Sequence, residues 1–263
     1  MNREQKLARI ARAKEHVRLG RLVAGCYMDA DSSDGQVRGC SVGCDAADIQ
    51  LMNGVDIEDL VDDDCHKIVA DHDHTQEWVE HLREAVFDGL PADTSDWWHV
   101  ELAECLPETD DWVPYYHRCC VVCLTESLSH RHRWHEPCKQ VVVDAIEAVI
   151  ELHRSESVDK AAWSAAEAAA KSARRVAQVA AWHARRVARS AVDSAGDSAA
   201  TAATAATAAW AACQAATDPN GSTARYARQI VNATADSGAW ASGWSSAFKR
   251  IADKLILEFA RPK

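Results

Sequence analysis

The first residues that could do chemistry are the two cysteines of RGCSVGC (38–44). Cys40 and Cys44 stand four residues apart, each directly after a glycine. Structural zinc sites use four cysteine or histidine ligands in a tetrahedron, so this pair would need two further ligands. The sequence offers Cys26, Cys65 and His66. Because C-x3-C is not the usual zinc spacing, a glycine-supported turn whose thiols pack inward is the alternative interpretation.

A second group of cysteine and histidine residues follows the pattern C-x2-C-x11-H-x2-C. Its members are Cys120, Cys123, His135 and Cys138, with His130 and His132 as alternative ligands. The spacing resembles that of a zinc ribbon. However, YYHRCCVVCL (115–124) is equally typical of a buried helix in which cysteine acts as a small hydrophobic residue. Both interpretations stay open.

Catalytic signatures are absent from the sequence. The segment DHDHT (71–75) offers the alternating Asp and His of some metal-dependent hydrolases. If it is helical, His72 and His74 lie on different faces, which favours a solvated surface. There is no glycine-rich phosphate loop, nucleophile elbow or H-E-x-x-H pattern. We therefore predict no catalytic residue, and a zinc-dependent enzyme built on the N-terminal half is the alternative hypothesis.

Charge is distributed unevenly along the chain. Residues 1–155 hold 31 acidic and 15 basic side chains, a balance of −16, whereas 156–263 hold 9 and 14, a balance of +5. Such asymmetry predicts that the halves attract each other or meet different partners. The candidate partner-binding residues are Asp59, Asp62, Asp63, Asp64, Arg174, Arg175, Arg185 and Arg186. The arginines come from ARRVAQ (173–178), repeated as ARRVAR (184–189). We expect a protein partner. For the arginines, binding of phosphate or nucleic acid is the alternative. The simplest interpretation of both charged groups is a solvated surface.

The elements that would position these residues are helices, so the predicted fold is all-α. Helical spacing of apolar residues covers 65–88, 94–106, 111–128 and 135–154, while 20–64 is rich in Gly, Ser and Asp and is expected to be irregular, with at most a hairpin at DSSDG (31–35). Composition divides the chain into an acidic Cys/His-rich helical region (1–155) and an alanine-rich helical array (156–263).

The alanine-rich array is expected to pack its helices closely. Alanine is the best helix former, and its small side chain lets helix axes approach. Tryptophans would anchor this thin core: Trp163, Trp182, Trp210, Trp240 and Trp244. No stretch of about 18 apolar residues predicts a membrane span, and the first residues do not form a secretory signal. We therefore expect a cytoplasmic protein with reduced cysteines.

Three segments, in this order, carry a resemblance to a known group of proteins: GQVRGCSVGC (35–44), EHLREAVFDGLPAD (80–93) and FKRIADKLILEF (248–259). The chain resembles uncharacterised proteins encoded in phages and prophages, which have a Gly-Cys-x-x-Gly-Cys turn and Ala/Trp-rich helices. It departs from them by an acidic insert before His66 and by more Arg and Thr in its C-terminal helices. The resemblance implies a phage accessory protein, and such proteins often inhibit host defence. Together with the polarised charge and the missing catalytic signature, it predicts a non-enzymatic inhibitor of a host defence component, such as a CRISPR effector. An immunity protein against a toxin is a further alternative.

Overall fold

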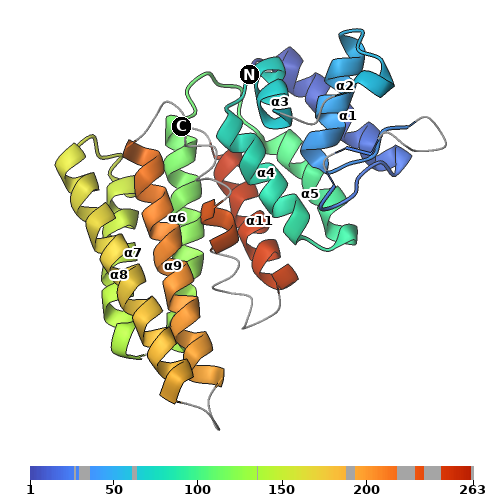
Figure 1. The fold of residues 1–263 in the computed structure, drawn as a ribbon. Coiled ribbons are helices and arrows are strands. Elements are labelled where there is room, and N and C mark those ends of the chain that lie inside the picture. Colours follow the sequence, from blue (N-terminus) through green and yellow to red (C-terminus); the bar gives the residue numbers. More distant parts are fainter. Residues whose placement is uncertain are drawn as a thin grey trace. The chain divides into compact units, whose positions relative to one another are not determined.

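The structure is a computed structural model, and it describes residues 1–26, 28–29, 36–60, 64–134, 136–187, 193–217, 229–233 and 244–261. The side chains of 133, 183–199, 215–217, 244, 245 and 247 lie outside the described part. Within it the secondary structure is helical, without strands, apart from two isolated β-bridges, so the all-α prediction is confirmed (Figure 1). Within the same residues, no helix combines the length and hydropathy that a membrane span requires.

The chain divides into two compact units. Unit 1 comprises Met1–Val113 and Ala252–Lys263, and unit 2 comprises Pro114–Ile251. The change of composition near residue 155 therefore lies inside unit 2. The helices of unit 1 are α1 (Arg3–Leu19), α2 (Ser41–Met52), η1 (Ile57–Asp59), α3 (Cys65–Asp73), α4 (Glu77–Gly89) and α5 (Ala92–Cys105). Those of unit 2 are α6 (Val113–Ser129), η2 (Arg131–Arg133), α7 (Glu136–Arg154), α8 (Lys160–Val187) and α9 (Asp193–Thr217), and α11 (Trp244–Ala260) has residues in both.

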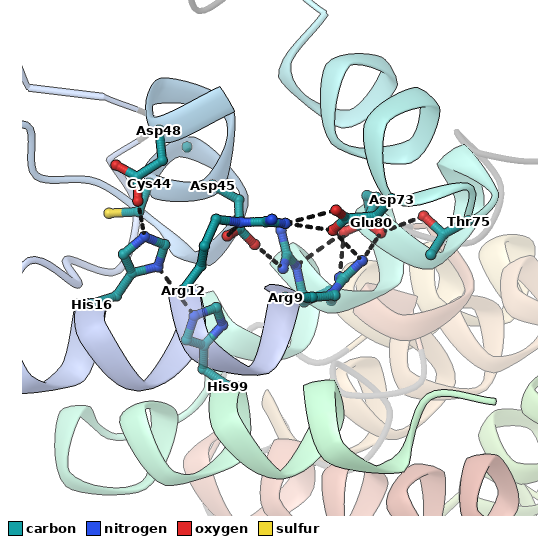
Figure 2. Close-up of polar contacts among 12 residues, drawn as sticks. Arg9, Arg12, His16, Cys44, Asp45, Asp48, Asp73, Thr75, Glu80 and His99 are labelled. Carbon is teal, nitrogen blue, oxygen red and sulfur yellow. Dashed lines mark hydrogen bonds and ion pairs between the residues drawn. The ribbon is translucent and has the colours of Figure 1, made fainter. Parts of the chain in front are cut away.

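A network of buried charges joins the first helices of unit 1 (Figure 2). Three arginines pair with three carboxylates: Arg9 with Glu80, Arg12 with Asp73, and Arg83 with Asp45. Their N···O distances are 2.8, 2.7 and 2.6 Å, and the carboxylate side chains are at most 1% exposed. Burial by itself would raise the pKa of Glu80, but the charges of Arg83 and Arg9 outweigh it and lower that pKa to about 2.

A chain of imidazoles continues this network toward α5. Nε2 of His16 lies 2.8 Å from Asp48 Oδ2, and its Nδ1 lies 3.4 Å from Nε2 of His99. Burial holds the pKa of His99 well below its ordinary value, so this ring stays neutral at physiological pH. The two histidines connect α1, α2 and α5 through polar contacts inside the unit.

Two predicted elements of unit 1 are wrong. The expected single helix over 65–88 is two helices, because His74 adopts the left-handed conformation (φ 52°) and ends α3. The segment 41–52, expected to be irregular, is helix α2, and most of its residues are buried. Its buried Asp45 is paired with Arg12 and Arg83, so contacts from distant helices favour a helix that local composition does not. The predicted hairpin at DSSDG lies outside the described residues.

Alanine packing holds unit 2 together, as expected. The helices α7, α8 and α9 all contact one another. One stripe of α8 is buried at helical spacing: Ala166, Ala170, Ala173, Ala177 and Ala181. The facing helix α9 buries alanines from 202 to 212. α8 begins at a cap, since Oδ1 of Asp159 accepts a hydrogen bond from the amide of Ala161 at 2.8 Å.

The tryptophans of unit 2 differ in their environment. Trp163 is 3% exposed and packs edge-on against His153, with ring centroids 4.9 Å apart, as a core anchor would. Trp182 is 54% exposed, so its predicted role in the core is wrong. Trp240 and the side chain of Trp244 lie outside the described residues.

Candidate metal centre

Three metal-ligating side chains converge in unit 1. His66 stands in the first turn of α3, and His81 and Glu84 stand three residues apart on α4. One potential ligand atom from each lies within 4.8 Å of the others. The helices α3 and α4 contact each other, and the turn at His74 reverses the chain between them. Residues i and i+3 share a helix face, so His81 and Glu84 both meet His66.

The donor atoms are close and largely shielded from solvent. Nε2 of His66 lies 3.0 Å from Oε2 of Glu84, and the rings of His66 and His81 stack with centroids 3.6 Å apart. The side chains of Glu84, His66 and His81 are 2%, 8% and 19% exposed. Two ligands of a tetrahedral zinc ion with bonds of about 2.0–2.1 Å lie about 3.3 Å apart, so the donors are near ligating distance. The stacked imidazole rings would have to tilt apart to direct their nitrogens at one ion.

His81 also has a partner outside this group. Its Nε2 lies 3.5 Å from Oε1 of Glu77, one turn earlier on α4, while its Nδ1 is buried. Metal-bound histidines commonly place their second ring nitrogen against a carboxylate, which orients the ring and makes it a better ligand. If a metal ion were bound here, Nδ1 of His81 would be the nitrogen that faces it and Glu77 would orient the ring.

The two cysteines of RGCSVGC have different surroundings. Cys40 is the N-cap residue of α2, and its Sγ lies 3.9 Å from Oε1 of Glu84. Sγ of Cys44 instead contacts the backbone carbonyls of Arg21 and Gly39, at 3.5 and 3.4 Å. Burial raises the pKa of both thiols to about 12, so neither is a ready nucleophile.

Of the other ligands proposed for this pair, His66 belongs to the convergent group. Cys26 is half-buried, and its carbonyl accepts a hydrogen bond from the amide of Cys40. Cys65 is buried at the start of α3. Among the described residues, the convergent group contains neither of them, nor Cys40 and Cys44.

The second predicted cluster belongs to unit 2. Cys120 and Cys123 are buried in α6, and Cys138 is buried near the start of α7. His135 lies outside the described residues, so the four-ligand set stays a prediction. Burial raises the pKa of Cys120, and Tyr116 and Cys213 lie in its surroundings. This environment fits the interpretation of these cysteines as small apolar residues.

The DHDHT segment serves the ion network. Asp73 is fully buried between Arg9 and Arg12, and its Oδ1 lies 2.9 Å from Nδ1 of His72. His74 ends α3 in the left-handed conformation, and its carbonyl accepts a hydrogen bond. Among the described residues these side chains are not part of the convergent group.

The predicted partner-binding residues are only partly described. Asp59 and Asp64 are exposed, while Asp62 and Asp63 lie outside the described residues. Arg174 stacks over the ring of Trp210, 5.2 Å from its centroid, so it contributes to packing within unit 2. Arg175 is exposed on α8, and the side chains of Arg185 and Arg186 lie outside the described part.

Sequence reasoning missed His81 and Glu84. Their signal is an H-x-x-E spacing inside an amphipathic helix, EWVEHLREAVFDG, where both side chains are largely buried and buried polar side chains need partners. Neither has a neighbouring cysteine, so a search for cysteine clusters passes over them.

Fold and site together define an all-α protein with a buried donor set of two histidines and one glutamate. No protein family, no curated protein and no solved structure matches the chain.

Proposed function

We propose that this chain is a zinc-binding protein in which the metal stabilises unit 1, and that it acts by binding rather than by catalysis. The observation that supports the proposal is the convergence of His66, His81 and Glu84 within 4.8 Å. Two imidazoles and one carboxylate suit zinc, and also suit iron(II). The nearby Cys40 thiol favours zinc, because soft sulfur donors select it.

The burial of the donors supports a structural role. A catalytic zinc ion needs an open position where water and substrate reach the metal. Here Glu84 and His66 are almost fully buried, and His81 is the most exposed of the three. A metal enclosed in this way would contribute to folding, because the free energy of binding becomes free energy of folding.

Elemental mass spectrometry after zinc loading tests this proposal. We expect one zinc per chain, lost in His81→Ala and in Glu84→Gln. His72→Ala is the matched control, since this histidine lies on the neighbouring helix α3 with a 37% exposed side chain. Zinc at about 100 times its Kd should raise the free energy of unfolding by ~2.7 kcal/mol. Equal zinc content in wild type and His81→Ala would contradict the proposal. If the protein bound iron(II) but not zinc, the proposed metal would be wrong and iron(II) would take its place in the proposal.

A second candidate function, inhibition of a host defence protein, is favoured by a surface of unit 2. Three large apolar residues lie along α8 at helical spacing: Val176, Val179 and Trp182, which are 39%, 55% and 54% exposed. The exposed Arg175 stands four residues before Val179 and adds positive charge to this strip. We propose that the strip binds a protein surface that is apolar at its centre and acidic at its edge.

Phage plating on bacteria that each carry one defence system tests the inhibitor hypothesis. The chain should restore plating in at least one strain, and Val179→Asp should abolish the effect. Val158→Asp is the control, because Val158 is 94% exposed and lies before α8. Unchanged plating in every strain, with the protein expressed and folded, would count against this candidate.

A further inference from the structure

The two oxygens of Glu84 face different partners. Oε2 lies 3.0 Å from Nε2 of His66, and Oε1 lies 3.9 Å from Sγ of Cys40. A structural zinc site is closed by four protein ligands, whereas a catalytic site has three and keeps the fourth position for water. The convergent group supplies three ligands, so the fourth ligand decides which kind of site this is.

We propose that Cys40 is the fourth zinc ligand, which closes the centre as a structural Cys-His-His-Glu site; this inference rests on the proposed zinc function. Cys40 is 1% exposed, and among the described residues its thiol is in contact with a member of the convergent group. Because Sγ stands outside that group, ligation requires a change of χ1 or a small movement of α2 toward α4.

The position of Cys40 on its helix suits a metal-bound thiolate. Cys40 is the N-cap of the twelve-residue helix α2, and the amide of Gly43 donates to its Sγ at 3.4 Å. The N-terminus of a helix favours negative charge, and its free amides can donate to a sulfur that also binds a metal. The backbone amide of Gly43 therefore already donates to the thiol.

Cys44 provides a matched control within the same motif. It is buried one turn further along α2, and its thiol contacts the carbonyls of Arg21 and Gly39 rather than Glu84. It holds the irregular segment before α2, and Cys40 faces the centre. The two cysteines therefore have separate roles, and substituting each in turn separates metal ligation from packing.

Closure by Cys40 would also fix the segment that leads into α2. The carbonyl of Cys26 accepts a hydrogen bond from the amide of Cys40, and Leu22 and Gly39 form a parallel bridge. A metal bond at Cys40 would fasten this segment to α4, where Asp88 already accepts a bond from the amide of Gly25 at 2.9 Å. Zinc removal should therefore increase amide exchange at residues 21–26 and 36–40.

Cobalt(II) substitution of the full chain tests the ligand directly, because a thiolate bound to cobalt gives an intense near-ultraviolet charge-transfer band. We expect this band in wild type and in Cys44→Ser, and its loss in Cys40→Ser. Zinc affinity of Cys40→Ser should fall by about 100-fold or more, since even outer-shell partners are worth about 10–100-fold. X-ray absorption of the zinc-loaded wild type should show one sulfur at about 2.3 Å, a readout that needs no variant.

The outcomes separate this inference from the proposed function. Cobalt binding without the band, at equal affinity in wild type and Cys40→Ser, would overturn the role of Cys40 and leave a three-ligand zinc site. A band lost only in Cys44→Ser would also overturn it. Absence of any metal binding would refute both proposals together.

Discussion

Units 1 and 2 bury their interiors by different chemistry. Unit 1 places three arginines and three carboxylates in its interior, and all of these carboxylates are at most 1% exposed. Unit 2 buries a stripe of alanines on α8 against the alanines of α9. Paired charges are directional and depend on every partner, whereas alanine packing depends on close approach of two backbones. The units should therefore fail under different perturbations.

Loss of one buried arginine should lower the free energy of unfolding more than any other change proposed here. This destabilisation should be confined to unit 1. Arg9→Ala leaves Glu80 and Asp73 buried without one of their partners. Removal of one member of a buried pair typically costs ~3–5 kcal/mol. Urea unfolding followed by circular dichroism measures the change. Arg18→Ala is the control, because its pair with Glu15 is exposed and should matter little. Equal, small effects of both variants would show that the network does not hold the unit together.

Overpacking should be the corresponding weakness of unit 2. Ala173 is fully buried on α8, so Ala173→Leu forces α8 and α9 apart and should cost ~1–3 kcal/mol. Ala169→Leu, at an exposed position of the same helix, should change stability by less than ~0.5 kcal/mol. The free energies of unfolding of the two variants give the comparison. Equal values would mean that the helices are not closely packed at Ala173.

The contrast also explains which features the sequence could predict. Periodic patterns depend on neighbours in sequence, so the all-α class, the close packing of the alanine helices, and α5 to α7 could be predicted to within a few residues. Helix α2 could not, because its formation depends on Asp45 meeting Arg12 and Arg83 from other helices. The break at His74 depends on one residue in the left-handed conformation, which apolar spacing does not reveal.

The candidate centre was predictable in part for the same reason. His66 stood out because it follows Cys65 and an acidic run. His81 and Glu84 are brought to it by the α3–α4 turn, and spacing along the chain shows only that they share a face with each other. The sequence therefore predicted the chemistry of the ligands and one of their positions, while the fold was needed to assemble the group.

Mild acid should have a smaller effect, which starts from the buried neutral histidines of both units, His99 in unit 1 and His153 in unit 2. Burial and the neighbouring His117 lower the pKa of His153 to about 3, whereas in the unfolded chain a histidine titrates near 6.5. Below pH 6.5 the histidine is therefore protonated in the unfolded state but stays neutral in the folded state. The free energy of unfolding falls with pH until pH 3 is reached. At pH 5.5, one unit below 6.5, this contributes a loss of ~1.4 kcal/mol.

The carboxylates of unit 1 respond later. With a folded pKa of about 2, Glu80 contributes stability that is complete above its unfolded value near 4.3 and is lost only as pH falls toward 2. Urea unfolding at pH 7.5 and 5.5 should therefore show a decrease in wild type that is smaller by ~1.4 kcal/mol in His153→Asn. Asparagine keeps a polar group near Nδ1, which lies 2.8 Å from Nδ1 of His117. An equal decrease in both proteins would mean that His153 is not the group whose protonation weakens unit 2.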